Sequence, residues 1–240
     1  FPGLYAILAR MHMDAYGTSE ADLAAVAVKN HYHASLNPNA QFHNLLSVDQ
    51  VLKSSKIADP LKLLDCSPIS DGAAAVVLTT KKHKKSIRVS ASVVATDTLG
   101  LAQRSSLTEL KATRTAAQKA YAMANVSAKD VHLVEVHDCF TIAEILAMED
   151  LGLFAKGKAA PAVVAGKTML GDRATVVINP SGGLKGCGHP VGATGVKQVV
   201  ELVEQLRGNA GKRQVDGVTV GLTHNVGGSG ATAVVHILEK

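Results

Sequence analysis

The part of the sequence that most restricts the fold runs from residue 87 to the end, where strand-like and helix-like patterns alternate. Period-two or continuous apolar runs predict five strands, and apolar stripes at helical spacing predict three helices between them. The expected order β-α-β-α-β-α-β-β is typical of a layered α/β domain. We therefore expect a mixed five-stranded sheet covered by helices. The expected strands are Ile87–Val93, Val131–Val136, Thr175–Ile178, Val215–Leu222 and Ala231–Leu238. The expected helices are Leu110–Asn125, Thr141–Leu151 and Val196–Leu206. The apolar side of the first helix holds Ala112, Ala116, Ala120 and Met123, and the apolar stripe of the third also includes Val199, Val200 and Val203.

The first 86 residues are less regular. A helix is expected after Thr18 or Ser19, and a shorter one after Ser47, because hydroxyl side chains at these places can cap a helix N-terminus. The apolar run Ala73–Leu78 predicts a buried strand. The charge run KKHKKS at 81–86 predicts a solvated linker.

Composition excludes several classes of protein. With 47% hydrophobic and 19% charged residues, the chain is too apolar to be intrinsically disordered. No apolar run approaches the roughly 18 residues of a membrane span. The net charge of +5 favours a small anionic substrate and does not require a nucleic acid. The three cysteines are too few for a disulfide framework, so we expect a reducing compartment.

The turn after the strand expected at Val131–Val136 contains three reactive side chains. His137, Asp138 and Cys139 follow the strand directly and precede a helix. Open α/β sheets build their sites at the carboxyl ends of strands, and a cysteine at a helix start gains thiolate character. The alternative is a structural turn with a buried cysteine.

Two glycine-rich segments follow later strands. The loop INPSGGLKGCGHPVGATG at 178–195 lets backbone approach a ligand closely, and it holds His189 where that ring could act as a base. The loop lacks the spacing of a Walker lysine or of the three-glycine dinucleotide motif, so a nucleotide cradle is disfavoured. The segment THNVGGSGA at 223–231 forms either a nest of backbone N–H groups for an oxyanion or a plain hairpin turn.

A structural zinc site is a rival interpretation. His137, Cys139, Cys187 and His189 supply two imidazoles and two thiolates. Their spacing differs from that of the common zinc fingers, which makes a metal site the weaker hypothesis and favours a chain without a metal.

Four motifs in order give the sequence a family resemblance. SDGAAA at 70–75, HDCF at 137–140, NPSGG at 179–183 and GHPVGATG at 188–195 resemble those of thiolases, and HDCF resembles the subfamily associated with sterol carrier protein. KNHYHASLNPNAQF, QLRGNAGKRQV and HNVGGSGA are similar to segments of that subfamily. The resemblance implies a loop domain over 1–64, the last strand of an N-terminal half over 65–80, and a complete C-terminal thiolase domain over 87–240.

The resemblance also implies roles for individual residues in the thiolysis of a 3-ketoacyl-CoA, or in the reverse condensation. His189 would activate the nucleophile, and Cys139 would protonate the enolate of the departing acyl-CoA. His137 and the backbone N–H of Gly227 would bind oxyanions. Asn179 would hold the loop as a supporting residue. Coenzyme A would be a co-substrate, and no cofactor would be bound permanently.

Two departures from the common thiolases qualify this interpretation. Asn225 stands where they place their acid/base cysteine, so that role falls to Cys139. Their nucleophilic cysteine lies in the N-terminal half, and neither Cys66 nor Cys187 matches its motif. We therefore expect the C-terminal portion of a thiolase, inactive alone and a homodimer in full-length form, in the peroxisome, the mitochondrion or a bacterial cytoplasm. A non-catalytic subunit that binds CoA esters or lipids is the alternative.

Overall fold

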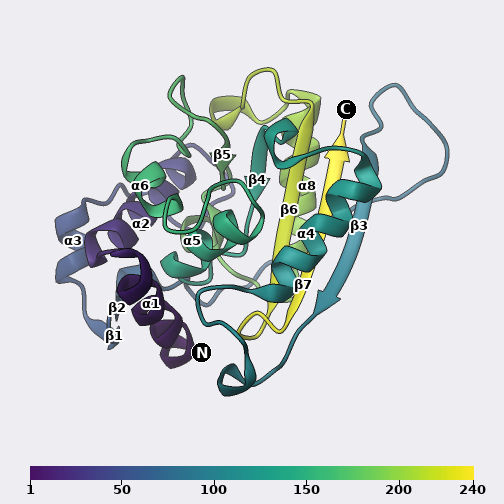
Figure 1. Cartoon of the computed structure of the whole chain (residues 1–240). Helices are drawn as coiled ribbons and strands as arrows, with labels where there is room; N and C mark the ends of the chain where they lie inside the picture. Colours follow the sequence, from purple (N-terminus) through teal and green to yellow (C-terminus); the bar gives the residue numbers. More distant parts are fainter.

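The computed structural model describes residues 1–240 and contains one five-stranded sheet in the order β3-β7-β6-β4-β5 (Figure 1). β4 pairs in parallel with both β5 and β6, whereas β7 is antiparallel to β3 and to β6. The expected mixed five-stranded sheet is therefore confirmed. Its strands are β3 (Arg88–Thr96), β4 (Leu133–Glu135), β5 (Val177–Ile178), β6 (Val220–Gly227) and β7 (Thr232–Glu239).

Helices cover both faces of this sheet. α4 contacts β3 and β7 on one face, and α8 packs behind β6 and β4 on the other (Figure 1). A two-stranded hairpin, β1 (Lys56–Ala58) and β2 (Leu61–Lys62), lies among the first helices. None of the helices is long and apolar enough to cross a membrane. The helices are α1 (Pro2–Tyr16), α2 (Glu20–Ser35), α3 (Val48–Lys53), α4 (Lys111–Ala124), α5 (Thr141–Asp150), α6 (Ala159–Val164), α7 (Gly183–Cys187) and α8 (Thr194–Arg207).

Local capping fixes the start of the two helices expected in the N-terminal region. The Ser19 hydroxyl accepts the backbone N–H of Asp22, and the Asp22 carboxylate accepts the N–H of Ser19. Ser47 and Gln50 make the same reciprocal pair at α3. Each pair satisfies two backbone donors that the first helical turn would otherwise leave unbonded. Both predicted helix starts are confirmed.

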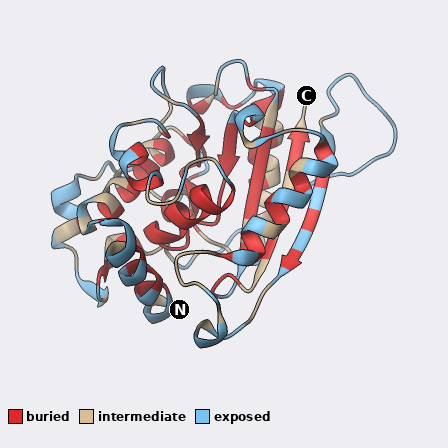
Figure 2. Cartoon of the chain, viewed as in Figure 1, coloured by how far each residue is buried: buried red, intermediate tan, exposed pale blue.

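The core lies around α5, all of whose residues are buried, as Figure 2 shows. α4 packs a stripe of alanines against β3 and β7, at Ala112, Ala116 and Ala120. Met123 was expected on that stripe but is exposed. The buried stripe continues in steps of four residues to Ala124, which leaves position 123 on the outer side of the helix.

The buried face of α8 differs from the predicted valine stripe. Leu206 is buried, but Val196, Val199, Val200 and Val203 are only half-buried. The buried positions are instead largely polar, namely Thr194, Gln198, Glu201, Leu202 and Gln205. Two of these side chains bond groups elsewhere in the fold: Arg213 donates to the Glu201 carboxylate, and the Gln198 amide nitrogen donates to the His224 carbonyl. Apolar spacing therefore identified the helix but not its inner face.

Strand β6 lies later in the chain than predicted. It covers Val220–Gly227, whereas apolar character alone predicted Val215–Leu222. His224 and Asn225 therefore belong to the strand, and the turn to β7 contains only residues 228–231. The pairing of β6 with both β4 and β7 supplies backbone partners along its whole length, which is why polar side chains are accommodated there.

The buried strand predicted at Ala73–Leu78 is wrong. The segment has no regular structure, and Val77 and Leu78 are 93% and 78% exposed. A strand needs a neighbouring strand to pair its backbone groups, and the sheet ends at β3 and β5 without including this segment. The linker predicted at 81–86 is an exposed loop, visible at the upper right of Figure 2.

Candidate active site

Three parallel strands bring the candidate residues to one edge of the sheet. β4, β5 and β6 run in the same direction, so their carboxyl ends lie side by side. His137 follows β4, Asn179 follows β5, and Gly227 is the last residue of β6. This edge is where open α/β sheets place their sites.

The two histidines predicted to be catalytic lie against each other. The rings of His137 and His189 meet edge to face, with centroids 5.0 Å apart and planes at 89°. His137 comes from the end of β4, and His189 from the loop between α7 and α8. The His189 backbone N–H donates to the Ser70 hydroxyl at 3.0 Å, and Ile69 forms an isolated β-bridge with His189. Residues far apart in the sequence thus fix this loop.

The hydrogen bonds around His189 determine which of its nitrogens is free. Nδ1 lies 2.7 Å from the Thr194 hydroxyl, which donates its own proton to the Pro190 carbonyl at 3.1 Å. The hydroxyl therefore accepts from His189, so Nδ1 carries the proton and Nε2 is bare. Burial, followed by the charge of Lys197, lowers the pKa of His189. The ring is therefore neutral near pH 7, with a basic nitrogen available.

His137 is oriented by Asn225. Its Nδ1 is hydrogen-bonded to Asn225 Oδ1, which can only accept, so the Nε2 of a neutral ring carries no proton. Burial lowers the pKa of His137 to about 4, and the neighbouring His189 adds to the shift. The predicted oxyanion-donor role needs a proton on Nε2. It therefore requires the Asn225 amide to turn its nitrogen toward the ring, or a proton added to His137.

Asp138 joins the two histidine-bearing segments. Its carboxylate accepts the backbone N–H groups of Leu184 at 2.6 Å and Lys185 at 3.2 Å, in α7, and the Asn30 amide of α2 at 2.8 Å. A Cβ on Gly183 would lie 2.3 Å from Asp138 Oδ2, so only glycine permits this approach. The turn that carries His137 and Cys139 is therefore fixed to the segment that leads to His189.

Asn179 holds the same turn from the other side. Its Oδ1 accepts the N–H of Val136 at 2.8 Å, and its Nδ2 donates to Glu144 at 2.8 Å. Glu144 is paired with Lys29 of α2 at 2.8 Å, and both side chains are buried. The contacts of Asn179 agree with the supporting role expected for it, although they test no step of a reaction.

Cys139 is buried beside α1. Its carbonyl accepts the N–H of Ser67 at 2.9 Å, and its side chain belongs to the main apolar core. Burial raises the pKa of its thiol to about 12. The thiol is consequently protonated at neutral pH, contrary to the thiolate character expected from the helix start. A protonated thiol is the form that a proton donor needs.

Gly227 lies at the mouth of the β6–β7 turn, where it pairs with Thr232. The turn is tight, because the Gly230 N–H donates to the Gly227 carbonyl at 3.1 Å. Residues 223–227 of the glycine-rich segment therefore belong to strand β6, and only residues 228–231 form the hairpin turn. Its geometry does not test the oxyanion role predicted for the Gly227 N–H.

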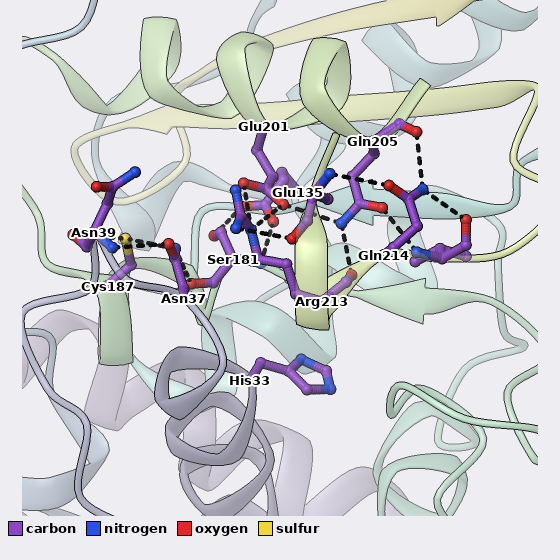
Figure 3. Close-up of polar contacts among 12 residues, drawn as sticks. His33, Asn37, Asn39, Glu135, Ser181, Cys187, Glu201, Gln205, Arg213 and Gln214 are labelled. Carbon is purple, nitrogen blue, oxygen red and sulfur yellow. Dashed lines mark hydrogen bonds and ion pairs between the residues drawn. The ribbon is translucent and has the colours of Figure 1, made fainter. Parts of the chain in front are cut away.

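Cys187, the fourth member of the rival zinc set, points into a different network. Its thiol lies 3.6 Å from Asn37 Nδ2, which also donates to the Ser181 carbonyl. Figure 3 shows this group beside Glu135, whose carboxylate accepts both the N–H and the hydroxyl of Ser181. No three His, Cys, Asp or Glu side chains in the structure form a group that could hold a metal ion. The four proposed ligands therefore do not converge.

Buried charged groups hold the glycine-rich loop through Ser181, which bonds the Glu135 carboxylate. Burial, with a contribution from Glu201, raises the pKa of Glu135 to about 7. Glu201 of α8 is itself paired with Arg213 at 2.8 Å (Figure 3). Glu135, the last residue of β4, and Val136, which follows it, thus bond Ser181 and Asn179 respectively.

Sequence reasoning missed several residues of the site, namely Lys29, Asn30, Glu144 and Thr194. Lys29, Asn30, His33 and Asn37 lie at helical spacing and are all buried, which gives α2 and its end a polar inner face. From sequence alone, polar residues on a helix face predict exposure to solvent. Their burial becomes evident only when the structure shows their hydrogen-bond partners. The segment resemblance at 29–42 was the one available signal.

Comparison with known proteins agrees with this architecture. The thiolase N-terminal domain family matches residues 3–82, and the thiolase C-terminal domain-like family matches residues 93–240. The chain is 52% identical, over 246 residues, to an acetyl-CoA acetyltransferase of Methanothermobacter thermautotrophicus, and it covers 63% of that protein. It is 40% identical to sterol carrier protein 2 of Gallus gallus over 97% of its own length and 44% of that protein.

Two solved structures share the fold. The aldolase Ltp2–ChsH2(DUF35) superposes with a TM-score of 0.84 at 24% identity, over 98% of this chain and 62% of that one. A monomeric SCP2-thiolase-like protein from Mycobacterium smegmatis gives 0.74 at 17% identity, over 99% and 51%. The family matches and the relatives together establish that this chain belongs to the thiolase superfamily, as a protein of the sterol-carrier-protein-2 type.

Proposed function

We propose that this chain is part of a thiolase-type acyl-CoA C-acyltransferase, which cleaves a 3-ketoacyl-CoA to a shorter acyl-CoA and acetyl- or propionyl-CoA, or runs the reverse condensation. The observation that carries the proposal is the bare Nε2 of His189, set beside His137 at the strand edge that also carries Cys139. Such a set suits a reaction that needs one base and one acid.

In the proposed reaction, the nucleophile is a cysteine from the part of the relatives that lies beyond these 240 residues. His189 Nε2 takes its proton, and the thiolate attacks the C3 carbonyl of the substrate. The C2–C3 bond then breaks, and its electron pair goes to the enolate of the departing acyl-CoA. Cys139 gives that enolate its proton. The Cys139 thiolate then takes the proton of the coenzyme A thiol, and the resulting coenzyme A thiolate takes the acyl group from the nucleophile. The released nucleophile regains its proton from His189, so both groups return to their starting states.

Two oxyanions develop along this route, one on the acyl carbonyl and one on the thioester of the leaving group. The strand edge places Gly227 and His137 on neighbouring strands, β6 and the end of β4. Donors fixed before the reaction stabilise such charges without reorganising. Coenzyme A is then a co-substrate, and no permanently bound cofactor is needed. A homodimer stays part of the proposal.

A non-catalytic subunit is the second candidate, and an exposed apolar segment favours it. Ile69, Val77 and Leu78 are 100%, 93% and 78% exposed, which is typical of a surface that another polypeptide covers. A structural neighbour with the same fold, the Ltp2–ChsH2(DUF35) aldolase, is named for two components. In this candidate, the His137–Cys139 turn would bind a CoA ester without turning it over.

The test is the thiolysis rate of the full-length protein and of its His189→Ala variant. We expect the variant to lose activity by about 100-fold or more, since a general base contributes that much. His83→Ala, in the exposed 81–86 linker, is the matched control and is expected to keep the full rate. A full-length protein that binds acyl-CoA without thiolysis would support the second candidate and contradict the first.

A further inference from the structure

The first two residues of α8, Thr194 and Gly195, lie beside both histidines of the site. They follow the loop that carries His189, and α8 packs on β6, the strand that carries Asn225. Thr194 is fully buried, and its hydroxyl oxygen lies 2.7 Å from His189 Nδ1. The backbone of Gly195 lies against the Asn225 amide, which is hydrogen-bonded to His137. One helix end is therefore next to the groups that hold the two rings.

The Thr194 hydroxyl has a single proton, and it donates that proton to the Pro190 carbonyl at 3.1 Å. Only its lone pairs are left for His189 Nδ1, so the ring nitrogen is the donor of the second hydrogen bond. The tautomer of a histidine follows from the hydrogen bond that its other nitrogen makes. Thr194 therefore decides that Nε2 of His189 is the nitrogen without a proton.

Gly195 contributes the space that it leaves open. A Cβ at this position would lie 2.8 Å from Asn225 Nδ2, closer than a Cβ packs in a folded protein, and the next atom, Asn225 Cγ, would be 3.9 Å away. Gly195 does not have a positive φ, so its backbone conformation does not require glycine. A side chain at position 195 would have to displace the Asn225 amide, whose Oδ1 is hydrogen-bonded to His137 Nδ1.

We propose that the start of α8 positions both rings: Thr194 fixes the tautomer of His189, and Gly195 leaves the room in which Asn225 orients His137. Each ring makes one side-chain hydrogen bond in the structure, to Thr194 and to Asn225 respectively. The inference rests on the proposed function, because that function assigns the roles of the two rings. Thr194 and Gly195 act through other side chains, so both are positioning residues.

The experiment records the ring nitrogen signals of the full-length protein labelled with ¹⁵N-histidine, because a protonated ring nitrogen and a bare one give well-separated signals. His189→Gln and His137→Gln assign the two rings. Thr194→Val keeps the shape of the side chain and removes the hydroxyl, so we expect a proton to appear on Nε2 of His189. The kcat of thiolysis should fall about tenfold with little change in KM, since one hydrogen bond contributes about that factor. Thr194→Ser should restore the signals and the rate.

Thr113→Val is the matched control. Thr113 is another fully buried threonine, and its hydroxyl lies 2.9 Å from Nε2 of His224, a buried histidine that has no part in the proposed reaction. Its loss should leave the signals of His189 and His137 unchanged. Unchanged His189 signals in Thr194→Val would overturn the role of Thr194.

Gly195→Ala tests the second residue. Alanine is usually more stable than glycine inside a helix, so a fall in activity here does not follow from a weaker helix. We expect the His137 signals to shift while those of His189 stay in place. Gly3→Ala, at the second residue of α1, puts a Cβ where no atom lies within 4 Å and should shift neither ring. Unchanged His137 signals in Gly195→Ala would overturn the role of Gly195.

The double variant Gly195→Ala/Asn225→Ala keeps the inference testable if Gly195→Ala alone fails to fold, because it removes the group that the new Cβ meets. If Gly195 acts through Asn225, the double variant should have the thiolysis rate of Asn225→Ala. A further fall in rate would contradict the proposal.

The ring signals need no turnover. If they change as expected while the full-length protein shows no thiolysis, the proposed function fails and the role of the α8 start stands. If thiolysis depends on His189 but neither ring responds to these substitutions, the inference fails and the proposed function stands.

Discussion

Two segments that carry family motifs have opposite environments in this molecule. The HDCF turn, His137–Phe140, is buried, and its Asp138 side chain bonds residues of α2 and α7. Val136, directly before the turn, bonds Asn179 in the loop after β5. The SDGAAA segment at 70–75 and the apolar residues after it are largely exposed and lack regular structure. Residues of this chain therefore surround the HDCF turn, whereas they leave most of the SDGAAA segment exposed.

The difference shows that a motif acquires its structure from its contacts. The HDCF turn is ordered by a polar face on α2, where Lys29 bonds Glu144 and the Ile178 carbonyl, and Asn30 bonds Asp138 and Glu144. The exposed segment has one firm attachment, at Ile69 and Ser70 beside His189. We call the HDCF turn with its α2 partners the braced region, because buried hydrogen bonds and an ion pair hold it. We call residues 70–78 the uncovered segment, because most of them are exposed.

Removing a buried charge should break the braced region most severely. Lys29→Met leaves Glu144 buried without its partner, and we expect the free energy of unfolding to fall by about 3–5 kcal/mol. Chemical denaturation measures this loss. Lys53→Met, which removes the exposed pair with Asp49, is the control and should change stability by about 0.5 kcal/mol or less. Equal losses in the two variants would contradict the contrast.

His33, in the same buried polar face of α2, should make the free energy of unfolding fall at acid pH. His33 is buried, donates from Nδ1 to the Asn179 carbonyl and accepts the Leu170 N–H at Nε2, so its ring is held neutral. Burial lowers its pKa to about 3, whereas an unfolded histidine titrates near 6.5. The unfolded chain therefore binds more protons between these values, and stability falls as the pH drops below about 6.5.

The His33→Gln variant isolates that contribution. Between about pH 6 and pH 4, its stability should depend on pH less steeply than that of the parent, by about 1.4 kcal/mol per pH unit, the value for one proton. Urea denaturation at a series of pH values gives both slopes. His83→Gln, in the exposed linker, should leave the slope unchanged. Identical slopes for His33→Gln and the parent would show that the ring is charged in the fold.

The uncovered segment should respond least. Val77→Ser changes an almost fully exposed side chain, so we expect the free energy of unfolding to stay within about 0.5 kcal/mol of the parent. Val26→Ser, at a fully buried position of α2, serves for contrast and should cost about 2 kcal/mol or more. A large loss in Val77→Ser would mean that this segment packs on the rest of the chain.

Sequence alone predicted what local interactions decide. Thr18 and Ser19 were both offered as the first cap, and Ser19 is the one that caps α2, whereas the cap at Ser47 was predicted directly. Both are accessible to sequence because a helix N-terminus is completed by residues three positions away. Five strands after residue 87 were also predicted in the correct order of appearance, although β6 lies later in the chain than its apolar run indicated. His137 and His189 were expected in one site, and the structure places their rings in contact.

What failed depended on partners far away in the chain. The buried polar face of α8 depends on two distant partners: Glu201 pairs with Arg213, and Gln198 donates to the His224 carbonyl of β6. Ala73–Leu78 has the composition of a buried strand but no strand beside it. No sequence signal linked Tyr5 to the β6–β7 turn, because only the fold brings its hydroxyl to 3.2 Å from the Gly228 carbonyl. Periodicity carries none of this information.

The central claim is that His189 and Cys139 divide the work of base and acid at one strand edge. The most direct measurement compares two steps in the full-length protein, acyl-enzyme formation from acyl-CoA alone and thiolysis of 3-ketoacyl-CoA. Cys139→Ala should still form the acyl-enzyme, seen by mass spectrometry, but lose thiolysis by about 100-fold or more. His189→Ala should lose both steps. Wild-type thiolysis in Cys139→Ala, or normal acylation in His189→Ala, would contradict this division of roles.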